Sequence, residues 1–247
     1  FMSSNGRESD PPLRSGLPIS DLVTGIYGAL GVTAALLRRE RGGGAEHVDV
    51  SLTNSMISLL AYLASNYFAT GRVTPRSGND HPIAAPYGLF ETADDPIAVA
   101  PNDDVFFGRL MDALDLAALK TDPDFASNHL RVANRDRLNA AVLARLATDT
   151  AAHWVETLNA AGVPCGPIYN IRQTFEDPQV EHLGLATPAP HPTLGDLTIV
   201  RHPTNLMRTP FQMRSAAPEQ GDATAETLAA LGYDAEEQAK LKADGVI

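Results

Sequence analysis

The sequence predicts a mixed α/β protein that is mostly helical and has a few short strands. Three observations predict this class. Apolar residues recur at helical spacing over about 19–37, and nearly all signals between 102 and 182 are helical. Polar and apolar residues alternate over 47–52, as they do in a half-buried strand. A short apolar run compatible with β-structure covers 97–100.

The first expected helix begins at Ile19. Its apolar positions at helical spacing are Ile19, Leu22, Val23, Ile26, Tyr27 and Leu30, and the pattern continues to Leu37. Arg38, Arg39 and Arg41 follow in the last turn, where cations complement the helix dipole. The run Gly42–Gly44 follows this helix and does not open one, so it predicts a C-terminal cap and not a phosphate-binding loop.

A second, more apolar helix is expected from about Asn54 to Ala69, buried on several sides. Residues 71–101 then carry loop and strand signals. Pro82 and Pro86 stiffen this segment because proline fixes φ and biases the preceding residue toward extended geometry. Asn102 is expected to cap the next helix. The apolar face of that helix comprises Phe106, Leu110, Met111 and Leu114.

Capping residues introduce the later helices. The expected caps are Asn134, Thr150 and Asp177, the last followed by Pro178. The apolar stripes behind the first two are Leu138, Val142 and Leu146, then Trp154, Val155 and Leu158, with an end at Gly162. Residues 183–212 are proline-rich and resemble a connecting arm with a hairpin-like pair near Gly195 and Asp196. Strands are expected at roughly 46–52, 88–100 and 184–200, and short helices at 225–231 and 234–242.

The charge distribution argues against some classes of partner. The net charge is −11, and the first 76 residues carry seven arginines against six carboxylates. The rest of the chain carries twelve basic and 24 acidic residues. Nucleic acids and anionic membranes attract basic faces, so we expect no nucleic-acid and no membrane partner.

Cysteine content and hydropathy indicate the compartment. Cys165 is the only cysteine, which excludes a disulfide framework and fits a reducing cytoplasm. No uninterrupted apolar run reaches membrane-spanning length, and the N-terminus lacks the order of a signal peptide. The histidines show no metal-ligand spacing, so no metal site is expected. Cys165, between two prolines, is more typical of a small buried side chain than of a nucleophile.

Local chemistry leaves each candidate site residue with two interpretations. The segment Ser77–His81 is either a loop that closes over a ligand or a surface turn. Asp103 and Asp104 are either an acid–base pair at a cleft or residues that complement a helix dipole, and the second is favoured. His81 and Tyr87 either contact a substrate or are simply half-buried.

The order of these segments resembles CoA-transferase family III, the CaiB/BaiF group, from about residue 11 onward. The matching pieces are 16–25, 34–41, 48–52, 78–79, 81–82, 86–88, 102–103 with Phe106, 122–125, 131–132, 134–135, 161–168, 177–180 and 228–234. The resemblance implies a parent fold with a Rossmann-like large domain, a smaller α+β domain and an interlocked homodimer. The implied divisions are 1–70 for the end of the large domain's first segment, 71–182 for the small domain and 183–247 for the return to the large domain.

The resemblance implies an enzyme that moves CoA from an acyl-CoA to a carboxylic acid through an aspartyl intermediate, with coenzyme A as co-substrate and no bound cofactor. The resemblance also suggests a role in fatty acid metabolism. The substrate-side loop and wall would comprise Gly78, Asn79, His81, Tyr87, Asn102 and Asp103. Ser77–His81 has one glycine where formyl-CoA transferases have several, which argues against oxalate or formate as substrate.

The nucleophilic aspartate of the family is expected before Phe1, since Asp10 and Asp21 do not occupy its position. The resemblance therefore implies a fragment, inactive alone. Two alternatives remain open. One is an α-methylacyl-CoA racemase-type enzyme of the same superfamily, in which Asp103 falls near an acidic residue of the chemistry. The other is a non-catalytic interaction module.

Overall fold

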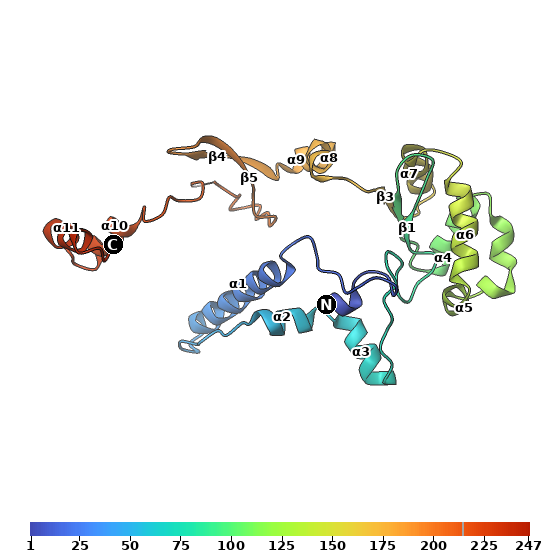
Figure 1. Cartoon of the computed structure of the whole chain (residues 1–247), viewed down its shortest axis with the longest axis horizontal. Coiled ribbons are helices and arrows are strands. Elements are labelled where there is room, and N and C mark those ends of the chain that lie inside the picture. The colour runs from blue at the N-terminus through green and yellow to red at the C-terminus, as the bar shows by residue number, and fades with distance from the viewer. Residues whose placement is uncertain (214) are drawn as a thin grey trace. The chain divides into compact units, whose positions relative to one another are not determined.

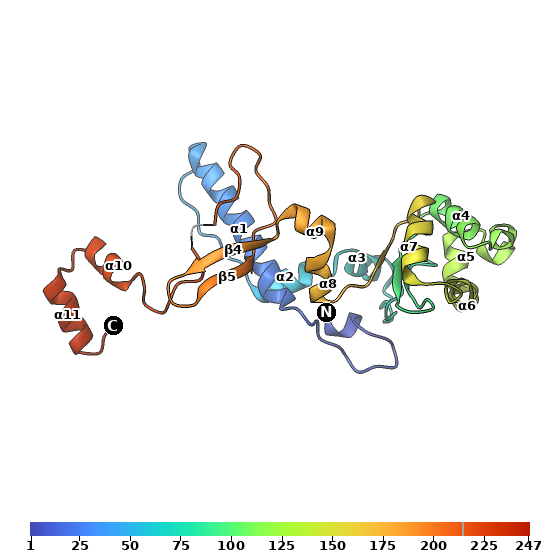
Figure 2. The same ribbon diagram turned by 90° about the horizontal axis from the view of Figure 1, so that it is seen from above.

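The computed structural model describes residues 1–213 and 215–247, and the chain divides into two units, 1–168 and 169–247 (Figures 1 and 2). The first unit contains the helices α1 (Ile19–Glu40), α2 (Leu52–Ser58), α3 (Ala61–Thr70), α4 (Asp104–Ala113), α5 (Asn128–Ala133), α6 (Arg135–Leu146) and α7 (Ala151–Ala160). Its strands are β1 (Gly88–Phe90), β2 (Ile97–Val99) and β3 (Cys165–Pro167). Short 3-10 helices lie at Met2–Ser4, Ala117–Thr121 and Pro123–Phe125. The mixture of helices and strands confirms the predicted α/β class.

α1 begins at Ile19, as the periodicity predicts, and its apolar side chains are exposed. Leu30 is 63% and Ile26 68% exposed, and no residue of the helix is buried. Gly42 has φ +86° and the amide of Gly43 donates to the Arg38 carbonyl, so the glycines end the helix as predicted. By length and composition alone α1 could cross a membrane, and none of its residues is buried within the chain. Core helices of globular domains share that composition, so the absence of a membrane partner stays a prediction.

Two expectations for residues 46–70 are wrong. Residues 46–51 form no strand, because no segment in the described part of the chain pairs with them. The hydroxyl of Ser51 instead accepts a hydrogen bond from the amide of Asn54 and caps α2. The single helix expected at 54–69 is broken into α2 and α3, with Ala61 at φ +40°, and only Ser55 in them is buried.

A small antiparallel sheet with the strand order β1-β2-β3 lies against the helices of the first unit (Figure 1). Phe90 pairs with Ile97 across β1 and β2, and Val99 pairs with Cys165 across β2 and β3. The sequence did not predict β3, because prolines flank Cys165 and β3 itself ends in Pro167. Proline is tolerated there because β3 is an edge strand with a free side.

The core of the first unit lies between this sheet and α4, α6 and α7. Its fully buried side chains include Ile97, Val99, Leu110, Met111, Leu114, Phe125, Leu138, Val142, Leu146, Trp154, Leu158 and Val163. The predicted stripes of α6 and α7 are confirmed, except that Val155 is only partly buried. On α4 the buried aromatic residue is Phe107 and not Phe106, because Phe107 continues the i, i+3, i+4, i+7 spacing to Leu114.

The capping predictions are confirmed in part. Thr150 and Asp177 accept hydrogen bonds from the first turns of their helices. Asn134 precedes α6 without a capping bond, because its amide group donates to the carbonyls of Leu130 and Asp124 instead.

The described residues of the second unit form a hairpin and four short helices. The hairpin pairs β4 (Ala186–His191) with β5 (Gly195–Val200) in antiparallel register, as predicted for 184–200. The helices are α8 (Ile171–Glu176), α9 (Pro178–Leu183), α10 (Thr224–Ala230) and α11 (Ala235–Ala243). The last two confirm the short helices expected near the C-terminus.

Candidate functional site

The segment Ser77–Asp80 is a hydrogen-bonded turn. The Ser77 hydroxyl donates to the Asp80 carbonyl at 2.6 Å, and the Asp80 amide donates to the Ser77 carbonyl at 3.1 Å. Gly78 has φ +64°, and a Cβ atom there would lie 2.9 Å from Cγ of Arg7. A side chain at this position would therefore meet both backbone strain and a close neighbour. Asn79 is exposed at the tip of the turn.

His81 stands between two tyrosine rings. Its ring centroid lies 4.7 Å from that of Tyr87, at 27° between planes, and 6.1 Å from that of Tyr62 on α3, at 14°. The His81 amide also donates to the Tyr87 carbonyl at 2.8 Å. These contacts bring the predicted residues His81 and Tyr87 together and add Tyr62, which the sequence did not single out.

The His81 imidazole has a defined hydrogen-bond partner on one side. Nδ1 lies 3.3 Å from the Ile83 amide, which donates to it. Burial and the nearby positive charge of Arg135 lower the pKa of His81 from its usual value. Both effects disfavour the imidazolium form.

Polar side chains of α5 and α6 hold the backbone that follows the turn. Asn128 donates to the Ile83 carbonyl at 2.7 Å and accepts from the Ala85 amide at 3.3 Å. Arg131 donates through Nε to the Ala85 carbonyl at 3.1 Å. Arg135 donates through Nη2 to the His81 carbonyl at 2.8 Å.

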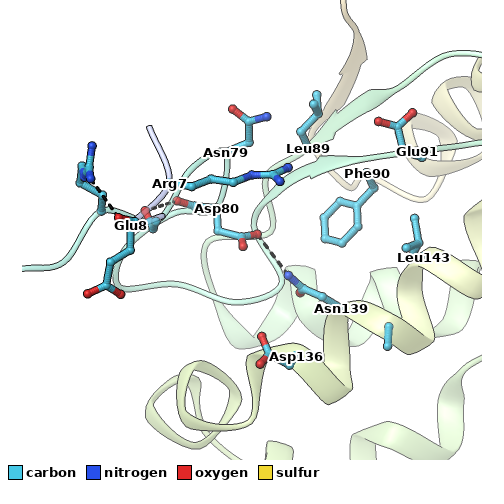
Figure 3. Close-up of a pocket in the computed structure, with 13 residues that line it drawn as sticks. Arg7, Glu8, Asn79, Asp80, Leu89, Phe90, Glu91, Asp136, Asn139 and Leu143 are labelled. Carbon is cyan, nitrogen blue, oxygen red and sulfur yellow. Dashed lines mark hydrogen bonds between the residues drawn. The ribbon is translucent and has the colours of Figure 1, made fainter. Parts of the chain in front are cut away.

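Asn139 lies one helical turn after Arg135 and contacts the turn Ser77–Asp80 itself. Its amide group donates to Oδ1 of Asp80 at 3.1 Å, and Figure 3 shows the two side chains pointing toward one another. We call Asn128, Arg131, Arg135 and Asn139 the clamp residues. Asn128 and Arg131 are three positions apart on α5, and Arg135 and Asn139 are four positions apart on α6, so each pair lies on one side of its helix. Such polar residues on an otherwise inward-facing stripe are the signal by which a sequence could reveal them.

Arg131 is the buried member of the clamp. Its side chain is 3% exposed, donates to the Phe125 carbonyl at 3.1 Å and lies 4.4 Å over the ring of Phe107. Nη2 pairs with the Asp104 carboxylate at 2.5 Å. The buried guanidinium is thus fully engaged, as a buried charge requires.

A cavity of about 630 Å³ lies beside the turn (Figure 3). Leu89, Phe90, Ala140 and Leu143 supply its apolar lining, and its polar lining comprises Arg7, Glu8, Arg76, Ser77, Asn79, Asp80, Glu91, Asp136 and Asn139. Within the described residues, three buried atoms lack a hydrogen-bond partner: Nη1 of Arg76, Nη1 of Arg135 and Oδ1 of Asn139. The first and last belong to residues that line the cavity.

Asn102 and Asp103 do not contact the turn through any hydrogen bond in the described structure. Oδ1 of Asp103 accepts from the Phe106 amide at 2.8 Å and caps α4, so the expectation that Asn102 is the cap is wrong. Asn102 and Asp103 are one position apart, and Asp103 is the one whose side chain reaches the first-turn amide. The next residue, Asp104, is connected to the loop instead. Its carboxylate accepts a hydrogen bond from Arg131, which also donates to the Ala85 carbonyl.

The cysteine and the possible metal-ligating side chains do not form a further reactive site in the described residues. Cys165 is half-buried, and burial raises the pKa of its thiol, which favours the unreactive protonated form. Across residues 1–213 and 215–247 no group of three or more histidine, cysteine, aspartate or glutamate side chains is placed to hold a metal ion.

Comparisons with known proteins indicate what the chain is similar to. A sequence model described as CoA-transferase family III matches residues 1–224. Acetyl-CoA:oxalate CoA-transferase of Acetobacter aceti is 37% identical over 180 residues, which cover 72% of this chain and 46% of that protein. Succinyl-CoA:glutarate CoA-transferase of Homo sapiens is 32% identical over 251 residues, which cover 100% of this chain and 57% of that protein.

A solved structure gives a similar result. The crystal structure of a CaiB/BaiF family protein from Brucella suis superposes with a TM-score of 0.75 at 32% sequence identity. The match covers 93% of this chain and 60% of that one. The chain spans about half the length of the curated relatives it matches.

Proposed function

Because the chain belongs to CoA-transferase family III, we propose that the protein moves CoA from an acyl-CoA thioester to a carboxylic acid. The observation that carries this proposal is the family match over residues 1–224. Relatives named as CoA-transferases for oxalate and for glutarate support it. Coenzyme A is a co-substrate here, and no other cofactor is required.

The proposed substrates are small dicarboxylic acids and their CoA esters. The relatives' names include oxalate, succinyl-CoA and glutarate, which share two carboxylates on a short chain. The single glycine in Ser77–His81 favours the longer acids over oxalate.

The proposed chemistry is covalent. An aspartate carboxylate attacks the thioester carbonyl and releases CoA thiolate, which leaves a mixed anhydride. The thiolate attacks the aspartyl carbonyl, forms an aspartyl-CoA thioester and releases the donor acid. The acceptor carboxylate repeats these two steps in reverse and leaves as its CoA ester, which restores the aspartate. Splitting the exchange into acyl transfers lowers each barrier. The nucleophile is expected outside residues 1–247, since Asp10 and Asp21 do not match its place.

The remaining expectations are part of the same proposal. They are a Rossmann-like large domain, a small domain over 71–182, an interlocked homodimer and a cytoplasmic location. The exposed apolar side chains of α1 support the interlocked homodimer. A second chain segment packed on α1 would remove that apolar area from water.

Isotope exchange in the complete gene product tests the function. The protein is incubated with succinyl-CoA and a panel of ¹³C-labelled acids, and the CoA esters are identified by mass spectrometry. Labelled glutaryl-CoA formed at the rate of succinyl-CoA loss, and faster than labelled oxalyl-CoA, is the expected result. Loss of the α-proton of a 2-methylacyl-CoA in D₂O, without acid exchange, would instead indicate the racemase. No reaction of either kind would indicate an interaction module.

A further inference from the structure

We propose that His81 is a neutral hydrogen-bond donor that contacts a substrate carbonyl or carboxylate oxygen through Nε2–H, and that Arg135 is its positioning residue. The inference rests on the proposed CoA transfer and adds a role for these residues to it. Four observations carry it: the hydrogen bond that Nδ1 of His81 accepts, the absence of a partner for Nε2 among the described residues, the two tyrosine rings beside the imidazole and the clamp that fixes its backbone.

The tautomer follows from the Ile83 contact. A backbone amide is always a donor, so Nδ1 of His81 must present its lone pair at 3.3 Å. A proton on Nδ1 would face the Ile83 hydrogen. The single ring proton of the neutral form is therefore on Nε2. Among the described residues Nε2 has no hydrogen-bond partner, and His81 is only half-buried, so this donor is available to a ligand.

The charged and titratable groups around His81 favour the neutral form. Arg135 faces it from α6, Tyr62 from α3, and Asp80 and Tyr87 from its own flanking chain. Asp80 accepts from Asn139 and lies 3.9 Å from Nη1 of Arg135, so the carboxylate offsets part of the arginine charge, and burial is the larger of the two causes that disfavour the imidazolium. Burial and Arg135 together lower the pKa of His81.

The surroundings fix the ring in place. Tyr62 and Tyr87 flank the imidazole, which restricts its rotation. Arg135 holds the His81 carbonyl at 2.8 Å, and Asn128 holds the Ile83 carbonyl at 2.7 Å. Because this partly buried donor is already fixed in place, it needs little reorientation to stabilise negative charge that develops on a nearby oxygen.

The chemistry of acyl transfer needs such a donor. Attack on a thioester or anhydride carbonyl places negative charge on oxygen, and the substrates are themselves carboxylates. A neutral donor stabilises that oxygen and keeps no proton poised for transfer to the CoA thiolate. Removing one oxyanion donor typically lowers turnover by about 10²–10³-fold. We expect a loss of about 10²-fold when the His81 donor is removed.

Substitutions in the complete gene product separate the donor from the stack. His81→Phe keeps an aromatic ring between the tyrosines but removes the donor, and is expected to lower kcat for CoA transfer by about 10²-fold with a smaller change in KM. His81→Gln keeps a donor and is expected to retain more activity than His81→Phe. The matched control is His129→Phe, since His129 is exposed on α5, and it is expected to match the wild type. Equal kcat for His81→Phe and the wild type would overturn the inference.

A separate NMR measurement of the His81 tautomer and pKa tests the positioning role of Arg135. In a protein labelled with ¹⁵N-histidine, the His81 signal, identified by its loss in His81→Phe, should show the Nε2–H tautomer at pH 7 and titrate below the usual histidine range. Arg135→Met removes the positive charge, so the His81 pKa and the acid limb of kcat should both move to higher pH. Arg135→Lys should restore most of the pKa shift. An Nδ1–H tautomer, or an unchanged pKa in Arg135→Met, would contradict the assignment.

Failure of the function is distinguishable from failure of this inference. Absence of CoA exchange in the wild type overturns the proposed function, whatever the His81 spectrum shows. Wild-type exchange with full activity in His81→Phe overturns the donor role alone.

Discussion

α1 and the α4–α7 region differ in what their apolar residues touch. Both have apolar positions at helical spacing, yet Leu110, Val142 and Leu158 are fully buried while Leu30 of α1 is 63% exposed. The pattern that predicts a helix also predicts a face that needs a partner, but it does not say where the partner lies. In α4–α7 the partner is within the chain, whereas α1 packs against α2 but keeps most of its apolar side chains exposed.

The largest effect expected from this comparison is on stability. Leu110→Ala should lower the free energy of unfolding by about 2–5 kcal/mol, because it leaves a cavity in a packed core. Leu30→Ala, the same change on α1, should cost less than about 0.5 kcal/mol in this chain. Urea unfolding followed by fluorescence of Trp154, the only tryptophan, measures both. Equal losses would mean that α1 is covered as well as the core.

The clamp predicts a second contrast. Arg131→Met should cost about 3 kcal/mol, since it leaves two buried carbonyls without their donor and removes the contact with the exposed Asp104 carboxylate. Arg137→Met is the control, because Arg137 is 53% exposed and pairs with Asp122 and Asp124 at the surface. It should cost less than about 1 kcal/mol. Similar losses of unfolding free energy in the two variants would show that the hydrogen bonds of Arg131 do not stabilise the loop more than a surface ion pair does.

Helix capping gives a smaller effect. Thr150→Ala removes the hydroxyl that accepts from the His153 amide and should cost about 1 kcal/mol. Thr157→Ala, within the same helix, removes no cap and should be close to neutral. The difference between the two free energies of unfolding isolates the cap. A cost for Thr157→Ala as large as that for Thr150→Ala would contradict this assignment.

The smallest expected effect is the pH dependence from His81. Its folded-state pKa is lowered, so between pH 6.5 and that lower value the unfolded chain binds the proton more readily. Stability should therefore decrease as the pH falls through 6.5, and the loss should level off below the folded pKa. Comparing wild type with His81→Phe between pH 7.5 and 5 measures the difference. A wild type that loses no more stability than His81→Phe would show that the His81 pKa is not lowered.

Local patterns predicted the helices well and the site only in part. The apolar stripes of α6 and α7 and the cap at Thr150 could be read from the sequence because they depend on neighbours a few positions away. The missing strand at 46–51 and the unexpected strand β3 depend on pairing with distant segments. The polar positions of α5 and α6 are visible in the sequence, but the segment that they contact is set only by folding. Tyr62 and Arg135 approach His81, and Asn128 and Asn139 approach its neighbours Ile83 and Asp80. The boundaries at 70 and 182 stay a prediction.

In the proposed reaction, CoA passes to a dicarboxylic acid through an acyl anhydride. The most direct measurement uses glutarate labelled with ¹⁸O in its carboxylates, succinyl-CoA and the complete gene product. In the proposed sequence the acceptor leaves one oxygen on the aspartate, and the next donor acid carries that oxygen away. Succinate with one ¹⁸O atom, formed in step with glutaryl-CoA, is the expected result. Glutaryl-CoA formed with unlabelled succinate, or succinate formed with free CoA alone, would contradict it.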